Sequence, residues 1–236
     1  MKALVTISIA VALTFALWIE IAPRNASAQE TAATGPTTEK LPPDIHPDTL
    51  SRMPRPKKED MTTDEEKQSF DRVLAFEPSL KDATGDLKPT GIRAWIPQAA
   101  EEYRKVGNLN EKYGLETKYV QLSYLVILRE SNDQPLWAKG AISGAKVLGA
   151  KTVEVVRNED DPSVLEDKKA AVIIRFGREL INQTKVSSTT FAEMEQSFGR
   201  KGTLNITLLM GYYYQNALLS RAYDQHSETD GQAPPW

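Results

Sequence analysis

The sequence predicts an all-α protein. No stretch of the 236 residues alternates apolar and polar side chains at the period of two that strands need. Apolar residues instead recur at helical spacing, and two segments, Thr63–Glu66 and Pro162–Glu166, fit the capping-box pattern that opens a helix. We therefore expect a bundle of about six to seven helices behind an extended, Pro-rich N-terminal arm.

Residues 1–28 have the features of a secretory signal peptide. Lys2 gives a positive start, Ala3–Ile19 is an uncharged apolar run, and Ala26–Ala28 supplies the small residues that precede cleavage. An uncleaved membrane anchor is the alternative, although a run of 17 residues is at the lower limit of the roughly 17–25 that span a bilayer. We expect cleavage after Ala28, a periplasmic or secreted mature chain, and no membrane association after cleavage.

The mature chain divides into three parts by composition. Residues 29–60 hold six of the 14 prolines, which predicts an extended arm without regular secondary structure. Residues 61–224 carry the helical patterns and form the predicted domain. Residues 225–236 are polar and contain proline, so we expect a frayed tail.

The helices of the domain follow one another between breakers. The capping box at Thr63 opens a helix that continues to about Phe76, and the prolines and glycines of 78–91 predict a loop. The segment 118–130 is apolar on most sides, which predicts a buried helix. Further helices are expected over 95–113, 137–148, from the second capping box through Leu180, over 187–198 and over 203–223.

Composition excludes several classes of function. The chain has no cysteine, which removes thiol chemistry and Cys-rich metal sites, and its two histidines are too few for a multi-histidine metal centre. The net charge of −3 lacks the basic excess of a nucleic-acid-binding protein. We therefore expect no metal, no cofactor and no nucleic-acid partner.

Three stretches carry a resemblance to a known family. They are Pro43–Asp60, Gly114–Gly149 and Leu165–Tyr214, and the last is the strongest, with Ile173–Leu180 followed by Lys185–Ser187 and Gly211–Tyr213. In their order and spacing they resemble the carboxymuconolactone decarboxylase family. The resemblance implies the alkylhydroperoxidase D-like helical fold and a homo-oligomer.

The resemblance does not extend to the catalytic groups. The family's decarboxylases carry a Glu near the start of the buried helix and a His three residues after a Trp. An alignment without gaps puts Gln121 at the first position and Gly140 at the second. Neither side chain can transfer a proton, and the hydroperoxidase branch needs a Cys pair that this chain lacks. The resemblance therefore implies a decarboxylase-like scaffold whose lyase and peroxidase chemistry is diverged or lost.

Two cations near these positions are candidates for a ligand pocket that also includes Gln121. Arg129, at the end of the buried helix, could clamp a carboxylate, or could simply favour the helix dipole and pair with Glu130. Lys139, next to the vacated histidine position, could supply a second cation, or could be a solvated surface lysine.

Aromatic residues complete the candidate pocket. Trp137 could wall a cavity or fill the core, and of the run Tyr212–Tyr214 we expect Tyr213 to face the pocket, although core packing explains the run equally well. His46 in the arm could reach the pocket of a neighbouring subunit, but a solvated histidine is the simpler reading, and His226 lies in the polar tail.

Two functions from different classes are compatible with these residues. The first is a secreted carboxymuconolactone decarboxylase-like protein with altered chemistry that acts on or binds a small organic acid or lactone. The second is a non-catalytic protein that uses the same scaffold for ligand sequestration or assembly. A pocket filled by side chains would favour the second function over the first.

Overall fold

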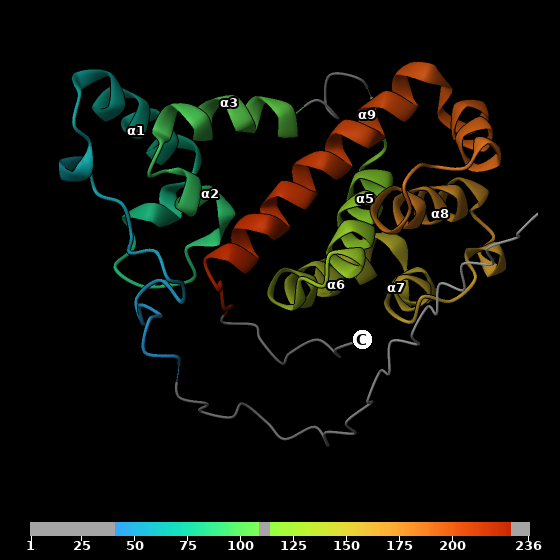
Figure 1. Cartoon of the computed structure of the whole chain (residues 1–236), viewed down its shortest axis with the longest axis horizontal. Helices are drawn as coiled ribbons and strands as arrows, with labels where there is room; N and C mark the ends of the chain where they lie inside the picture. Colours follow the sequence, from blue (N-terminus) through green and yellow to red (C-terminus); the bar gives the residue numbers. More distant parts are fainter. Residues whose placement is uncertain (1–40, 109–113, 228–236) are drawn as a thin grey trace, which may run out of the picture. The chain divides into compact units, whose positions relative to one another are not determined.

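The all-α prediction is confirmed by the structure, a computed structural model that describes residues 41–108 and 114–227 (Figure 1). Over these ranges it has eight α-helices, three short 3-10 turns and, in place of strands, one isolated bridge between His46 and Ser51. The predicted signal peptide, the first part of the arm and the end of the tail lie outside the described residues. None of the described helices has the length and apolar character needed to cross a membrane.

The first three helices form a small cluster with its own core. The predicted capping box begins α1 (Asp64–Phe76): Thr63 Oγ1 accepts a hydrogen bond from the Glu66 N–H at 3.1 Å, and the Glu66 carboxylate accepts one from the Thr63 N–H at 3.1 Å. The helices α2 (Lys88–Arg93) and α3 (Pro97–Gly107) complete the cluster. Its buried side chains are Met61, Phe70, Val73, Leu80, Leu87, Ile92, Ala94 and Ala100.

The main core surrounds α5 (Thr117–Glu130), which is the helix predicted to be buried. It contacts α6 (Gln134–Leu148), α8 (Lys168–Asn182) and α9 (Ser188–Ala222) (Figure 1). Because helices cover it on several sides, apolar side chains are needed on nearly its whole circumference. Leu122, Leu125, Val126, Ile127 and Leu128 are fully buried.

Two short helices lie where none was predicted. The segment expected to be a loop over 78–91 contains a 3-10 turn at Pro78–Lys81 and the beginning of α2. The helix α7 (Ala150–Arg157) follows α6 directly after Gly149, whose φ of 80° is a left-handed conformation that suits glycine. Helices this short gain most of their stability from packing, so their own sequence is a weak signal.

The second predicted capping box is wrong. Pro162–Val164 forms a 3-10 turn, in which the Asp161 carboxylate accepts a hydrogen bond from the Ser163 N–H at 2.9 Å. The helix α8 begins later, at Lys168, because Asp167 accepts from two of its free N–H groups, those of Lys169 at 3.0 Å and Ala170 at 3.1 Å. Asp167 therefore caps the helix in place of the predicted capping box at Ser163–Glu166, because one carboxylate accepts hydrogen bonds from two N–H groups.

The last two predicted helices run into each other. Ser187 caps the first, with its hydroxyl accepting from the Thr190 N–H at 3.2 Å. A kink at Gly199, where φ is 67°, replaces the break over 199–202 that was expected between the two helices. The predicted helix 95–113 corresponds to α3, and its last five residues lie outside the described ranges.

Candidate functional site

The two predicted catalytic positions are adjacent in space. The Gln121 side chain, on α5, donates hydrogen bonds of 3.2 Å to the carbonyl oxygen of Gly140 and to Ser143 Oγ, both on α6. The Gly140 position is enclosed, since a Cβ atom built there would lie 3.0 Å from the Tyr124 ring and 3.1 Å from Leu125. The amide of Gln121 therefore links two helices, and core residues fill the space beside Gly140.

The two aromatic pocket candidates belong to the core. Trp137 has no exposed surface, and Tyr213 packs edge-to-face on Tyr124, with 5.0 Å between ring centroids. Burial strongly raises the pKa of Tyr213, so its hydroxyl stays protonated at any physiological pH. Of the two alternatives for Trp137, the structure favours filling the core, because no surface of this side chain is open to solvent.

The two candidate cations already have partners. Arg129 donates through Nε to the Arg157 carbonyl at 2.8 Å and pairs through Nη2 with Glu159 at 3.0 Å. The Lys139 ammonium pairs with Asp86 at 2.9 Å. Both charges are thus used within the chain, which favours the alternatives of a structural Arg129 and a surface Lys139 over a carboxylate clamp and a pocket cation.

Glu130, the alternative partner expected for Arg129, interacts with the Arg129 charge and also contacts two residues of α8. Its carboxylate pairs with Arg178 at 3.4 Å and accepts a hydrogen bond from Asn182 at 2.6 Å. Burial raises the pKa of Glu130, and the Asn182 hydrogen bond and the charges of Arg178 and Arg129, which lower it, only partly offset this effect.

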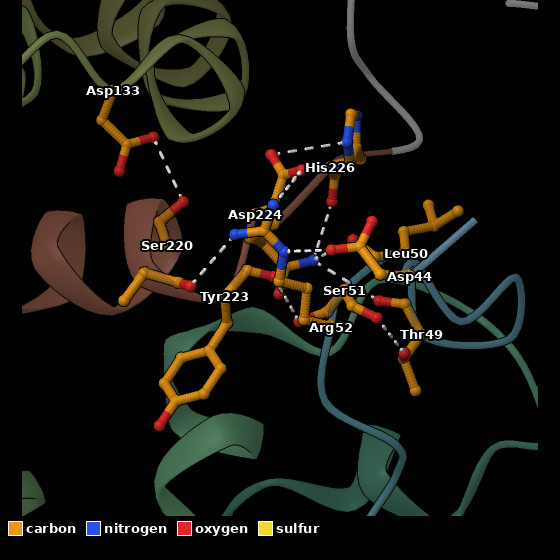
Figure 2. Close-up of polar contacts among 12 residues, drawn as sticks. Asp44, Thr49, Leu50, Ser51, Arg52, Asp133, Ser220, Tyr223, Asp224 and His226 are labelled. Carbon is orange, nitrogen blue, oxygen red and sulfur yellow. Dashed lines mark hydrogen bonds and ion pairs between the residues drawn. The ribbon is translucent and has the colours of Figure 1, made fainter. Parts of the chain in front are cut away.

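A polar junction joins the arm to the end of α9 (Figure 2). Arg52 contacts two carboxylates, that of Asp44 at 2.7 Å and that of Asp224 at 3.5 Å. The buried Ser51 hydroxyl donates to the Tyr223 carbonyl at 3.1 Å. The second part of the arm is therefore folded against the domain, whereas the sequence predicted an extended segment.

The beginning of the tail is part of the same junction. The Gln225 side chain is buried and donates to the carbonyl of Leu50 at 3.4 Å, and the His226 N–H donates to the same carbonyl at 2.7 Å. The prediction of a frayed tail is wrong for residues 225–227. His46 is exposed, as expected for an arm histidine, and its N–H donates to the Ser51 carbonyl at 2.9 Å.

Three of the cavities among the described residues are lined by none of the predicted pocket residues. One of them, about 400 Å³, lies along α8 and is lined by charged side chains that contact one another. Arg175 pairs with Glu193, and Arg178 donates to the carbonyls of Val155 at 2.9 Å and Asp160 at 2.7 Å. These charges stabilise the fold, so this cavity is a weak candidate for a binding site.

A smaller cavity of about 170 Å³ is lined by an arginine, Arg93, that forms no ion pair with a carboxylate of the described residues. Arg93, at the end of α2, lies over the ring of Tyr103 from α3, with its guanidinium carbon 3.9 Å from the ring centroid. Tyr103 stacks on Tyr212 from α9, with 4.5 Å between centroids, and donates its hydroxyl hydrogen to the Tyr212 carbonyl at 2.8 Å. Arg93 also donates to the neutral side chain of Asn216.

The same cavity has a second arginine on its wall. Arg104 lies over the ring of Phe76, 4.2 Å from its centroid, and both residues line the cavity together with Thr90. The one acidic lining residue, Glu77, pairs with Lys88 at 3.8 Å. We call Arg93, Arg104, Tyr103 and Tyr212 the arginine–tyrosine site.

The electrostatics of this site favour an anion. Within the described residues no carboxylate pairs with Arg93, and burial lowers the pKa of its guanidinium from the usual value. Burial also raises the pKa of Tyr103 to about 12, so the tyrosine is neutral and adds no negative charge. A half-buried cation without a counter-ion is unfavourable, and a bound carboxylate would relieve that cost.

Sequence reasoning missed this site because its residues are far apart in the chain. The Tyr212–Tyr214 run was the one signal that marked part of it. Across residues 41–108 and 114–227, no group of three His, Asp or Glu side chains could hold a metal ion. No protein-family model matches the sequence, and no curated protein matches it either.

Proposed function

We propose that this protein binds a small organic acid at the arginine–tyrosine site without changing it chemically. The single observation behind the proposal is Arg93, a half-buried cation that lines a cavity and has no acidic partner within the described residues. Arg104 adds a second positive charge to the cavity, and the stacked tyrosines offer a flat apolar wall. A cavity of about 170 Å³ suits a ligand of few atoms.

Binding without turnover follows from the positions that the family resemblance makes catalytic. Gln121 is engaged with Gly140 and Ser143, and Arg129 and Lys139 are engaged in ion pairs. The resemblance to carboxymuconolactone decarboxylases stays a prediction, as do the signal peptide and the periplasmic or secreted location. A ligand-sequestering protein on that scaffold is the alternative that these contacts favour.

Calorimetric titration of the purified protein with succinate and with inorganic phosphate tests the proposal. We expect succinate to bind, and Arg93→Gln to raise its Kd about tenfold or more because a charge-assisted hydrogen bond to the carboxylate is lost. Arg93→Lys keeps the charge but not the forked geometry of the guanidinium, so its Kd for succinate should lie between those of the wild type and Arg93→Gln.

Arg200→Gln is the matched control, because Arg200 is almost fully exposed and lies on α9 outside the cavity. Its Kd for succinate should equal that of the wild type. Equal succinate affinity of Arg93→Gln and the wild type would contradict the proposal. Phosphate binding that exceeds succinate binding would move the ligand class from organic acids to phosphate.

We further propose self-assembly through an exposed stripe on α9, formed by Leu204, Leu208, Gly211, Gln215 and Leu218. All five are exposed, the leucines by 59%, 44% and 46%. At 100° per residue they lie within an arc of about 80°, and they extend over about 21 Å of helix. Their spacing of four and three residues is the pattern of a helix that packs against another helix.

The stripe is complementary to itself, which favours a second copy of this chain as its partner. Leu204 and Leu218 each lie seven residues from Gly211. Two antiparallel copies that cross at Gly211 would therefore pair Leu204 with Leu218 of the second copy around a two-fold axis. A Cβ built on Gly211 would have no atom within 4 Å, so the position is open to a close approach by another helix.

A further inference from the structure

A third cavity, of about 220 Å³, lies between the beginning of α5 and the kink of α9, well apart in sequence from the arginine–tyrosine site. Tyr119 lines it from α5, Lys169 from α8, and Phe198 and Asn205 from the two sides of the kink at Gly199. Three helices thus contribute to one concave surface, and no residue of it belongs to the site proposed above.

The first observation is a buried amide without a partner. Asn205 is only 3% exposed, and its Oδ1 atom accepts no hydrogen bond from the described residues. A buried polar atom without a hydrogen bond is unfavourable and is rare in folded proteins. Because Asn205 lines the cavity, a ligand that brings an N–H or O–H group into it can supply the missing hydrogen bond.

The second observation is a pair of aromatic walls held in place. The rings of Tyr119 and Phe198 meet edge-to-face, with 5.3 Å between their centroids. The Tyr119 hydroxyl donates to the Asp167 carboxylate at 3.2 Å, and that carboxylate also pairs with Lys118 at 2.8 Å. The hydroxyl therefore points to Asp167, and the rings offer apolar surface to a planar ligand.

The third observation is the charge at the cavity. The Lys169 ammonium lies 5.5 Å from the centroid of the Phe198 ring, and no carboxylate of the described residues pairs with it. The acidic lining residue Glu116 already lies 3.7 Å from Lys118. Lys169 is thus available for a ligand carboxylate, while Asn205 lies buried on the same cavity surface.

We propose that this cavity binds a small aromatic carboxylate that carries a hydroxyl group. The ring would pack on Tyr119 and Phe198, the hydroxyl would donate to Asn205 Oδ1, and the carboxylate would pair with Lys169. This site is independent of the arginine–tyrosine site, because the two cavities share no residue.

The test uses 4-hydroxybenzoate, with benzoate and phenol as the probes that lack one of its two polar groups. We expect 4-hydroxybenzoate to bind best, because loss of either group removes one of the two polar contacts. Asn205→Leu should bind benzoate and 4-hydroxybenzoate equally, since the acceptor is gone. Lys169→Gln should bind phenol as the wild type does but should weaken 4-hydroxybenzoate. Lys151→Gln, a change of another exposed lysine, is its matched control.

The outcomes separate this proposal from the first one. Arg93→Gln should leave the Kd of 4-hydroxybenzoate unchanged, and an increase in that Kd would show that the probe binds at the arginine–tyrosine site and would overturn the proposal. Equal affinity of the wild type for benzoate and 4-hydroxybenzoate would also overturn it. If Asn205→Leu does not fold, the surface variant Lys169→Gln still tests the proposal. An unchanged affinity of Lys169→Gln for 4-hydroxybenzoate would contradict the proposed ion pair between the ligand carboxylate and Lys169.

Discussion

The Gln121 side chain donates a hydrogen bond of 3.2 Å to the carbonyl oxygen of Gly140. The two residues lie on α5 and α6, nineteen positions apart, and they are the pair that the family resemblance places at the catalytic Glu and His. Their chemistry excludes proton transfer. An amide that links two helices lies at these two positions.

We predict that the acid–base pair cannot be restored by substitution. Wild-type protein should not decarboxylate carboxymuconolactone above the buffer rate, because a positioned proton-transfer group contributes about 10²–10⁴-fold and both are absent. Gly140→His should lower the free energy of unfolding by about 1–3 kcal/mol or more, since even a Cβ lies within 3.0–3.3 Å of Tyr124, Leu125 and Leu128.

Gln121→Glu combined with Gly140→His should therefore be less stable than the wild type and equally inactive. The measurements are urea denaturation and a spectrophotometric assay of the lactone. Wild-type decarboxylation that survives Gln121→Ala would show that other residues carry the chemistry.

We predict self-association that depends on the α9 stripe. Leu208→Glu should convert the assembly to monomers in sedimentation velocity, because a charge at the centre of the stripe must be desolvated when two copies meet. Val164→Glu is the matched control, since Val164 is 52% exposed but lies in the 3-10 turn before α8. A monomeric wild type at micromolar concentration would contradict self-association through the α9 stripe.

Two glycines should respond in opposite directions to alanine. At Gly177 on α8 a Cβ would lie 2.5 Å from Val126 and 3.1 Å from Met210, so Gly177→Ala should lower the free energy of unfolding by about 1–3 kcal/mol. At Gly211 nothing lies near, so Gly211→Ala should raise it by up to about 1 kcal/mol.

Both alanine variants are best measured by urea denaturation in the Leu208→Glu background, so that association does not contribute. An unchanged free energy of unfolding for Gly177→Ala would contradict the close packing of α8 against Val126 of α5 and Met210 of α9.

Asp167 should make stability depend on acid pH. Burial alone would raise the pKa of Asp167, but hydrogen bonds from Lys118 and from the Ala170 N–H outweigh it and hold the pKa below the ordinary 3.8. The ionised form is therefore favoured by folding. Its contribution is present above pH of about 3.8 and is lost as the pH falls through the lower pKa of the folded state.

Asp167→Asn keeps a capping oxygen but removes the charge that pairs with Lys118. We expect it to lower the free energy of unfolding by about 0.5–1 kcal/mol at pH 7, a modest value because the pair is partly exposed. The difference from the wild type should shrink below pH of about 3.8. Asp82→Asn, an exposed control, should show no difference at either pH, and a constant difference for Asp167→Asn would refute the charge argument.

Local chemistry along the chain was sufficient for several features of this protein. The absence of cysteine excludes thiol chemistry outright, and the helical periodicity and the Thr63–Glu66 capping box predicted an all-α fold and the beginning of α1. The apolar character of 118–130 predicted that α5 is buried. Each of these depends on residues a few positions apart, whose interactions are the same in any fold that contains the helix.

Only the tertiary structure decided which side chains that are distant in sequence contact one another. The sequence predicted that α8 opens at Pro162–Glu166, but the helix begins at Lys168, after Asp167, which contacts Lys118 and Tyr119 on α5. Arg129 forms an ion pair with Glu159. Arg93 instead lies against the rings of Tyr103 and Tyr212, and no carboxylate of the described residues pairs with it. Whether an arginine is paired or available for a ligand depends on which carboxylates packing brings within about 4 Å of it, and spacing along the chain does not carry that information.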